Sequence, residues 1–224
     1  YMKKRIAING FGRIGRDFFR LTLQEPYASL VEVVAVNDLG DVDNLAYLLK
    51  YDTVYRQLDR DVTVSHEGDD TYLLVGEQKV RVCSDREPKN LPWGEMEVDI
   101  VVESTGFFTT TDTAQGHIEA GAKRVVISAP SKDDTPMVTP ALNEDALNQT
   151  VVSSNASCTT NATNPVAAVI HEALGIKKAM LSTIHGYTST QSLVDGMATK
   201  DVRRGRAAAM NIIPSSTGAA KAVA

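Results

Sequence analysis

The stretch that decides the fold is residues 6–15, Ile6-Ala7-Ile8-Asn9-Gly10-Phe11-Gly12-Arg13-Ile14-Gly15. It opens with a short apolar run typical of a buried strand, and the apolar residues at positions 18–23 predict a helix that ends near Pro26. The three glycines let the backbone turn tightly between strand and helix, and they let a pyrophosphate approach the free N–H groups at the helix N-terminus. Glycines with this spacing arise by chance in many chains, so the neighbouring sequence has to show whether they bind a pyrophosphate.

The context favours a dinucleotide-binding turn. Residues 31–36 are mostly β-branched, which predicts a buried parallel strand, and Asp38 follows that strand 23 residues after Gly15. An acidic residue in this place accepts hydrogen bonds from a ribose diol. The alternative is an ordinary tight turn with a solvated aspartate. We interpret Gly10, Gly12 and Asp38 as cofactor-binding residues.

The remaining pattern alternates between strands and helices. Further strands are expected at residues 62–64, 72–75, 80–83, 98–103, 124–128 and 151–152, with helices at 44–50 and 114–120. Beyond these, the pattern predicts a helix over 159–174, a strand over 178–185, a long ordered loop over 188–211 and a new helix from Gly218. The sequence therefore predicts an α/β fold: a Rossmann-type, doubly wound, mostly parallel sheet in residues 1–157, then the start of an α+β catalytic domain in residues 158–224.

Composition excludes several classes of protein. The chain has 224 residues, of which 43% are hydrophobic and 23% charged, which excludes a disordered tail, a collagen-like fibre and a disulfide-framed mini-protein. A net charge of −5 argues against broad nucleic-acid binding, which needs a basic face. No apolar run reaches the roughly 18 residues that span a bilayer. With two cysteines and no disulfide scaffold, we expect a reducing compartment, the cytoplasm, and we expect no metal site.

A candidate nucleophile lies in Ser157-Cys158-Thr159-Thr160-Asn161, where a strand and loop give way to a predicted helix. The dipole and free N–H groups of a helix N-terminus stabilise a thiolate, which lowers the thiol pKa. The alternative is a buried, inert cysteine. His185 ends a predicted strand and is the natural partner, because an imidazole there can accept and return the thiol proton. His66, His117 and His171 are expected to have surface or packing roles.

A third set of residues could hold a phosphate. Thr217 and Gly218 lie at a predicted helix N-cap, whose hydroxyl and N–H groups suit an anion. Thr188 and the arginines near position 204 are the other members. The alternative is a plain helix cap and a solvated basic loop.

Four segments, taken together, resemble the phosphorylating glyceraldehyde-3-phosphate dehydrogenase family, in order and over essentially the whole chain. They are NGFGRIGR at residues 9–16, STGFF at 104–108, SNASCTTN at 154–161 and IIPSSTGAAK at 212–221. The resemblance implies an NAD site lined by Arg13, Ile14, Asp38, Arg86, Ser104, Thr105 and Ser128, together with the glycine turn. It implies that Cys158 is the nucleophile and His185 its base. It also implies that the substrate phosphate or inorganic phosphate is held by Ser157, Thr159, Thr188, Arg204, Thr217 and Gly218.

The same resemblance implies glyceraldehyde 3-phosphate and inorganic phosphate as substrates, NAD as cofactor and a homotetramer. NAD is favoured over NADP because Asp38 repels a 2′-phosphate and Leu39 adds no compensating charge. The chain departs from the family at Ala162, where a second cysteine is common, and at Tyr55-Arg56-Gln57. Family chains continue well beyond Ala224, so a C-terminally truncated chain is expected. The alternatives are an erythrose-4-phosphate dehydrogenase, or a truncated NAD-binding chain without turnover.

Overall fold

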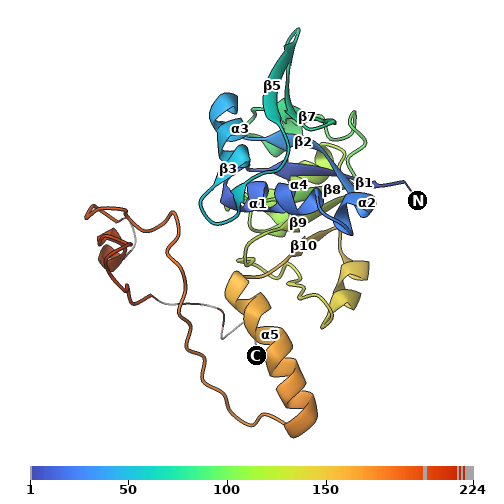
Figure 1. The fold of residues 1–224 in the computed structure, drawn as a ribbon. Coiled ribbons are helices and arrows are strands. Elements are labelled where there is room, and N and C mark those ends of the chain that lie inside the picture. Colours follow the sequence, from blue (N-terminus) through green and yellow to red (C-terminus); the bar gives the residue numbers. More distant parts are fainter. Residues whose placement is uncertain (1, 199–200, 216, 218, 220–224) are drawn as a thin grey trace. The chain divides into compact units, whose positions relative to one another are not determined.

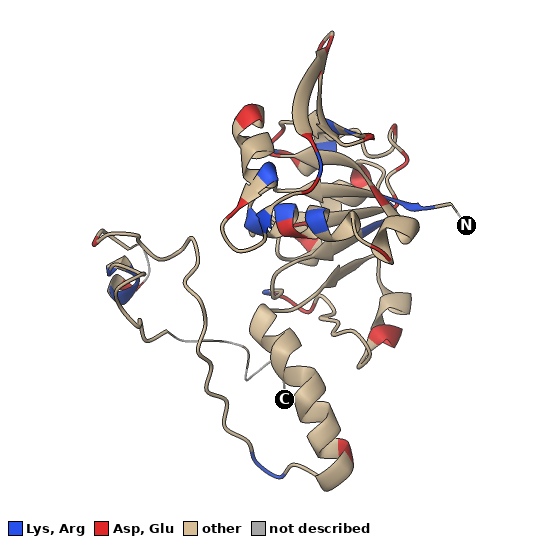
Figure 2. Ribbon diagram, viewed as in Figure 1, with Lys and Arg blue, Asp and Glu red and all other residues tan. Residues whose placement is uncertain are grey.

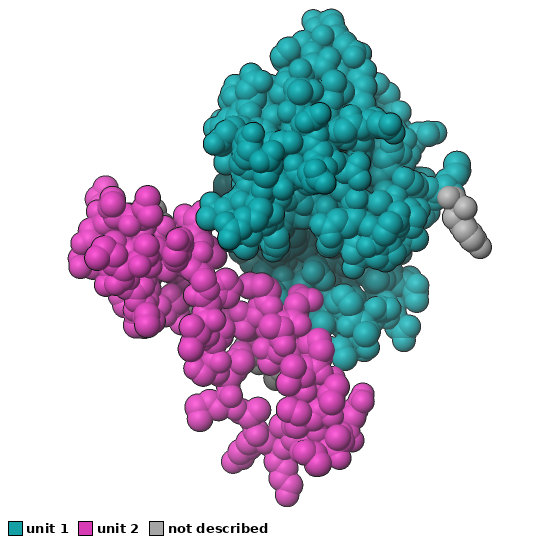
Figure 3. All heavy atoms as spheres, in the orientation of Figure 1, with its two compact units in different colours: residues 1–157 teal, residues 158–224 magenta. Residues whose placement is uncertain are grey.

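The protein has two compact units, residues 1–157 and residues 158–224 (Figure 3). The structure, a computed structural model, describes residues 2–198, 201–215, 217 and 219. The first unit carries the elements β1 (Lys4–Asn9), α1 (Arg13–Thr22), α2 (Tyr27–Leu30), β2 (Val31–Asn37), α3 (Val42–Lys50), β3 (Tyr51–Asp52), β4 (Arg56–Gln57), β5 (Val62–Glu67), β6 (Asp70–Val75), β7 (Gln78–Cys83), η1 (Pro88–Asn90), β8 (Ile100–Glu103), α4 (Thr111–Glu119), β9 (Arg124–Ile127), η2 (Glu144–Gln149) and β10 (Val152–Ser154).

One eight-stranded sheet organises the first unit, in the order β10-β9-β8-β1-β2-β7-β6-β5 (Figure 1). The strands from β10 to β7 pair in parallel, whereas β5, β6 and β7 form an antiparallel meander. The chain builds outward from β1 on one side and then crosses over to β8 on the other. The strand order therefore reverses between β1 and β8, which is where doubly wound sheets bind their ligands. The predicted α/β fold is confirmed.

The central strands β1, β2 and β8 have apolar, buried middles because both faces of the sheet are covered. Along β1, Ile6 and Ile8 belong to a core cluster with Phe19 of α1 and Leu49 of α3. Ala7, between them, belongs to a second cluster that contains Trp93 and residues of α4. Alternate residues of one strand thus serve two cores, which fixes the register of β1 and the positions of the residues at its carboxyl end.

The second unit has much less regular structure. It carries α5 (Cys158–Leu174), which ends before Gly175 with its φ of +75°, and η3 (Val202–Gly205). The strand predicted over residues 178–185 is wrong: this segment is irregular and largely exposed. A strand needs a neighbour for its N–H and C=O groups, and the described residues of this unit contain no second strand to pair with it. Most of the helix predicted from Gly218 lies outside the described residues.

The described parts of the loop between residues 188 and 211 are held in place by hydrogen bonds within the loop. Ser192 N–H donates to Arg204 C=O, and Gly196 N–H donates to Gly205 C=O at 2.8 Å. A Cβ on Gly205 would lie 2.1 Å from the Gly196 oxygen, so this close approach requires glycine. The loop thereby brings Arg204 into a fixed place relative to residues 188–192.

Candidate functional site

The glycine turn lies at the carboxyl end of β1, and its three glycines have different roles. Gly10 has a φ of +89°, and a Cβ on it would lie 2.7 Å from the Thr105 nitrogen. A Cβ on Gly15 would lie 2.2 Å from the Gly10 oxygen. A Cβ on Gly12, the N-cap of α1, would meet nothing within 4 Å. Gly10 and Gly15 therefore allow close backbone packing, and Gly12 leaves open space before the helix N-terminus, where a pyrophosphate fits.

Asp38 follows β2 and turns its carboxylate toward the glycine turn. Its Oδ2 accepts a hydrogen bond from Phe11 N–H at 2.7 Å, and its Oδ1 accepts one from Gly40 N–H at 2.8 Å. Two backbone donors thus fix the carboxylate beside the turn, while the lone pairs that remain can accept from a ribose diol.

Arg13 begins α1, but its side chain already has partners. Its Nη1 lies 2.7 Å from Asp52 Oδ2, its Nε lies 3.6 Å from Asp17, and the guanidinium stands over the Tyr55 ring. The Arg13 hydrogen bond holds the pKa of Asp52 well below its usual range. Figure 2 shows that basic residues predominate on α1, with an acidic residue among them. Arg13 and Ile14 are the first two residues of the helix and lie next to the glycine turn.

The other predicted cofactor residues lie at neighbouring strand ends, with one exception. Ser104 Oγ donates to Gly10 C=O at 2.6 Å, and Ser128 N–H donates to Glu103 C=O at 2.9 Å. Thr105 packs against Gly10, as described above. Arg86 is the exception: it is exposed on the loop between β7 and η1 and does not lie at a strand end. The structure therefore gathers Ser104, Thr105 and Ser128 around the reversal point of the sheet.

Cys158 and His185 meet in the second unit. Cys158 is the first residue of α5, and its Sγ lies 3.1 Å from His185 Nε2. His185 Nδ1 donates to Gly186 C=O at 2.6 Å, which assigns that ring proton and leaves Nε2 facing the sulfur. The His185 contact lowers the pKa of the Cys158 thiol, against a smaller opposing effect of burial. The Gly186 carbonyl and then the Cys158 sulfur raise the pKa of His185. Both shifts favour the thiolate–imidazolium form of the pair over the neutral form.

A hollow of about 450 Å³ lies beside His185. Of the predicted phosphate residues, it is lined by Thr159, Thr188, Arg204 and Thr217. Ser157 belongs to the first unit, and Gly218 lies outside the described residues. The four lining residues come from α5, from the loop after His185, from η3 and from the segment after η3, so residues up to 58 positions apart share one concave surface.

The three neighbouring arginines differ in their partners. Arg203 Nη2 lies 2.8 Å from Asp201, and Arg206 Nη1 lies 2.8 Å from Asp195. Arg204 Nη1 donates to the Thr190 hydroxyl at 3.2 Å, and within the described part of the chain it forms no ion pair. Arg204 alone of the three lines the hollow. The Arg204 guanidinium is therefore the arginine charge that an anion in the hollow would meet.

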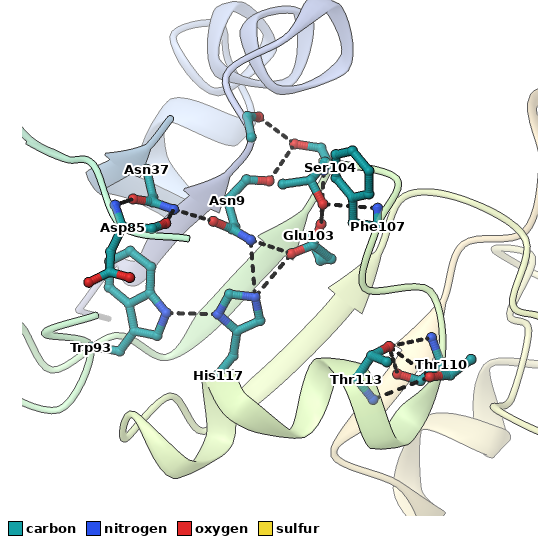
Figure 4. A network of polar contacts seen from close by, with 12 residues as sticks. Asn9, Asn37, Asp85, Trp93, Glu103, Ser104, Phe107, Thr110, Thr113 and His117 are labelled. Atoms are coloured by element: carbon teal, nitrogen blue, oxygen red, sulfur yellow. Dashed lines mark hydrogen bonds and ion pairs between the residues drawn. The ribbon is translucent and has the colours of Figure 1, made fainter. Parts of the chain in front are cut away.

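Sequence reasoning missed two groups of polar residues. Thr190 and Gln191 hold two lining residues of the hollow in place. Thr190 contacts both Arg204 and Thr188, and Gln191 Oε1 accepts a hydrogen bond from Thr188 N–H. Asn9, Asn37, Glu103 and His117 form a buried network at the strand ends (Figure 4). The signal for these was weak: three predicted strands each end in a polar residue, but the sequence does not say which strands are neighbours. His117, expected on the surface or in packing, is fully buried.

Comparison with known proteins agrees with this geometry. Residues 4–111 match the family model "Glyceraldehyde 3-phosphate dehydrogenase, NAD binding domain", and residues 157–224 match "Glyceraldehyde 3-phosphate dehydrogenase, C-terminal domain". The chain belongs to the glyceraldehyde-3-phosphate dehydrogenase family. It is 50% identical over 219 residues to the cytosolic glyceraldehyde-3-phosphate dehydrogenase of Trypanosoma brucei brucei, covering 98% of this chain and 64% of the relative.

Two bacterial members of the glyceraldehyde-3-phosphate dehydrogenase family are equally similar. The enzyme of Geobacillus stearothermophilus is 50% identical over 225 residues, covering 100% of this chain and 65% of the relative. Glyceraldehyde-3-phosphate dehydrogenase A of Escherichia coli (strain K12) is 50% identical over 222 residues, covering 99% and 65%. The chain therefore spans about 64% of the length of the curated relatives that it matches.

The family match identifies the first unit as an NAD-binding domain, so NAD is its cofactor. The open space at Gly12 and the fixed carboxylate of Asp38 fit that cofactor. Among the described residues, no group of three His, Cys, Asp or Glu side chains is arranged to hold a metal ion. No helix in the described part of the chain is long and apolar enough to cross a membrane.

Proposed function

We propose that this protein oxidises glyceraldehyde 3-phosphate with NAD and inorganic phosphate to give 1,3-bisphosphoglycerate. One observation carries the proposal: Cys158 Sγ lies 3.1 Å from His185 Nε2 at the start of α5. A thiolate is a good nucleophile for an aldehyde carbon, and a neighbouring imidazole can move the proton that the reaction requires. The hollow beside His185 supplies a place for the phosphate of the substrate or for inorganic phosphate.

Each residue of the pair has a defined part. The Cys158 thiolate attacks the aldehyde carbon, and the His185 imidazolium together with the Cys158 backbone N–H stabilises the developing oxyanion. A hemithioacetal on Cys158 results, and His185 accepts its hydroxyl proton as the carbon is oxidised. NAD, when bound, supplies the hydride acceptor. The product is a thioester on Cys158, which inorganic phosphate cleaves to release the acyl phosphate.

The phosphate ligands are proposed from the hollow. Arg204, with no carboxylate partner among the described residues, supplies the charge, and Thr159, Thr188 and Thr217 supply hydroxyl groups. Ser157 and Gly218 complete the set by the family resemblance. Arg203 and Arg206 are left out because Asp201 and Asp195 already neutralise them.

The cofactor half of the proposal assigns the NAD site to the reversal point of the sheet. The backbone of Gly10, Gly12, Arg13 and Ile14 would face the pyrophosphate, Asp38 the ribose diol, and Ser104, Thr105, Ser128 and Arg86 the remaining surface. Asp38 favours NAD over NADP because its carboxylate would repel a 2′-phosphate.

We further propose a homotetramer that works in the cytoplasm, without nucleic-acid or membrane partners. The family resemblance supports the assembly, and the name of the trypanosome relative, which is called cytosolic, supports the location. The net charge of −5 argues against nucleic acid as a partner.

The test is phosphate-dependent formation of NADH from glyceraldehyde 3-phosphate by the purified chain, beside a direct measurement of NAD binding. Turnover that requires phosphate and is lost in Cys158→Ser supports the proposal. NAD binding without turnover would instead support a cofactor-binding chain, an alternative favoured by the solvent exposure of Cys158 and His185. Faster oxidation of erythrose 4-phosphate than of glyceraldehyde 3-phosphate would contradict the substrate assignment.

A further inference from the structure

A buried carboxylate stands at the reversal point of the sheet. Glu103 is the last residue of β8 and is 1% exposed, although nothing in the proposed chemistry uses it. It is the register partner of Asn9 on β1, which in turn is the register partner of Asn37 on β2. These three residues form one polar row across the carboxyl ends of three neighbouring strands (Figure 4).

Four hydrogen-bond donors converge on this carboxylate. Oε2 accepts from Asn9 Nδ2 at 2.5 Å and from His117 Nε2 at 3.0 Å. Oε1 accepts from the backbone N–H of Thr105 at 2.8 Å and from the Thr105 hydroxyl at 2.5 Å. Four donors on two oxygens match the capacity of an ionised carboxylate, which has no proton of its own to place.

The Asn9 donor cannot reverse its direction. Asn37 is fixed by the backbone of Asp85, whose N–H donates to Asn37 Oδ1 and whose C=O accepts from Asn37 Nδ2. The same Asn37 Nδ2 donates to Asn9 Oδ1 at 2.7 Å. The Asn9 amide must therefore present its NH₂ group to Glu103.

The His117 donor is fixed as well. Trp93 Nε1, which can only donate, lies 3.0 Å from His117 Nδ1. Nδ1 is therefore the acceptor, and we assign the ring proton to Nε2, which faces Glu103. With the proton on Nδ1, that atom would face the Trp93 donor with no acceptor between them. Nε2 also lies 3.3 Å from Asn9 Nδ2, but those two donors share Glu103 Oε2 as their acceptor.

We propose that Glu103 is a positioning residue for the cofactor site, because its carboxylate holds Thr105 and the adjoining glycine turn in place. Thr105 sits between the buried network and the surface: its hydroxyl donates to Glu103 and accepts from Phe107 N–H at 3.1 Å. The Thr105 nitrogen lies 2.7 Å from the position of a Gly10 Cβ. A displacement of Thr105 therefore moves the surface against which Gly10 packs. This inference rests on the proposed NAD site.

Glutamine cannot replace this carboxylate, although it has the same shape. If its NH₂ group faced Asn9 and His117, it would meet two donors that their own partners prevent from reversing. If the NH₂ group faced Thr105, the backbone N–H of that residue would lose its acceptor in a partly buried place. Glu103→Gln should release the Thr105 segment while leaving the apolar packing unchanged.

The experiment compares NAD affinity and amide hydrogen exchange in the wild-type chain, Glu103→Gln and Val102→Ala. Val102 precedes Glu103 on β8, is 8% exposed and takes no part in the network, so its variant controls for lost stability. We expect the NAD dissociation constant to rise about tenfold in Glu103→Gln and less than twofold in Val102→Ala. Exchange in residues 105–107 should quicken in Glu103→Gln alone. Equal affinities and equal exchange in the two variants would overturn the inference.

A second pair of variants keeps the test decisive if Glu103→Gln does not fold. His117→Gln retains an acceptor for Trp93 and a donor for Glu103, whereas His117→Met retains only the size of the side chain. We expect near wild-type NAD affinity for the first and a severalfold loss for the second; equal affinities would contradict the inference. If the wild-type chain binds no NAD, the proposed function fails, and the exchange measurement still decides whether Glu103 holds Thr105.

Discussion

The two units place their polar groups in opposite surroundings. In the first unit, apolar side chains fill both faces of the sheet, and the polar strand ends, Asn9 and Glu103, are each 1% exposed. In the second unit, Thr160 is the one buried residue of α5, whose Val169 and Leu174 are 65% and 84% exposed. In Figure 2 the ribbon of α5 carries almost no colour of a charged residue. One unit holds its site by a packed interior, and the other holds its site by local hydrogen bonds.

This contrast explains what fixes the geometry of the first site and the pKa values of the second. A buried polar group without a partner costs on the order of 1–3 kcal/mol, so the first unit must satisfy every donor at its strand ends, and that requirement fixes their geometry. The Cys158–His185 pair is close to solvent, where charges are screened. Its pKa shifts depend on direct contacts at 2.6–3.1 Å, from the Gly186 carbonyl and between the two side chains.

The largest effect on turnover is expected for a variant of Cys158, which should leave cofactor binding unchanged. Cys158→Ser removes the thiolate, and we expect turnover to fall by about a thousandfold or more. NAD affinity, which belongs to the first unit, should stay within about twofold. Steady-state NADH formation and calorimetric NAD binding measure the two quantities. A parallel loss of both would show that the units do not work separately.

A pair of leucine variants compares the packing of the two units. Leu49 of α3 is fully buried, and Leu174 of α5 is 84% exposed. Leu49→Ala should lower the free energy of unfolding by about 2–5 kcal/mol, whereas Leu174→Ala should change it by less than about 0.5 kcal/mol. Urea denaturation followed by circular dichroism tests this. Similar losses in the two variants would mean that α5 is packed in solution.

A variant of Asp38 tests the cofactor site of the first unit. Asp38→Ala removes the acceptor for Phe11 N–H and for a ribose diol, so NAD should bind about ten- to a hundredfold more weakly. The preference for NAD over NADP should narrow, because the repulsion of a 2′-phosphate is removed. Dissociation constants for both dinucleotides give the result. An unchanged preference would assign cofactor choice to other residues.

The two thiols belong to different units and should differ in reactivity. Burial raises the pKa of Cys83 to about 11. Only about one Cys83 thiol in 10⁴ is then ionised at pH 7, whereas the His185 contact lowers the Cys158 pKa and so increases the ionised fraction of that thiol. The greater nucleophilicity of the more basic thiolate reduces this advantage by about tenfold, which leaves at least about a tenfold faster reaction at Cys158. Peptide mapping after limiting iodoacetamide measures the ratio, and faster labelling of Cys83 would contradict the geometry.

The pH dependence of that labelling tests the pair itself. The reactive thiolate exists above the Cys158 pKa, and the His185 contact is the largest cause that lowers this pKa. His185→Ala should therefore raise it, so the midpoint of the alkylation profile moves to higher pH. The reciprocal variant, Cys158→Ser, should lower the His185 pKa only in part, because the Gly186 carbonyl remains its main stabilising contact. Unchanged profiles would mean that the two side chains are not paired in solution.

Much of the first unit could be predicted from the sequence. The apolar runs at residues 6–9, 31–36 and 98–103 gave the central strands, because strands buried on both faces need continuous apolar sequence. The glycine spacing with Asp38 gave the turn. The role of Gly10 could not be predicted, since the backbone that it must admit, at Thr105, is about 95 residues away along the chain. The strand predicted over residues 178–185 was wrong for a related reason. An apolar pattern indicates a strand, but a strand forms only where a neighbouring segment can pair with its N–H and C=O groups.

The sequence by itself determined the order of the main elements of the first unit, the glycine turn and the candidates Cys158 and His185, because strand periodicity, helix caps and motif spacing are local properties of the chain. The tertiary structure alone decided which polar strand ends meet, which of the three arginines forms no ion pair with a described residue, and which way each donor points. These depend on contacts between distant segments and on the desolvation of polar groups inside the fold. A row such as Asn37, Asn9 and Glu103 exists only after β2, β1 and β8 lie side by side.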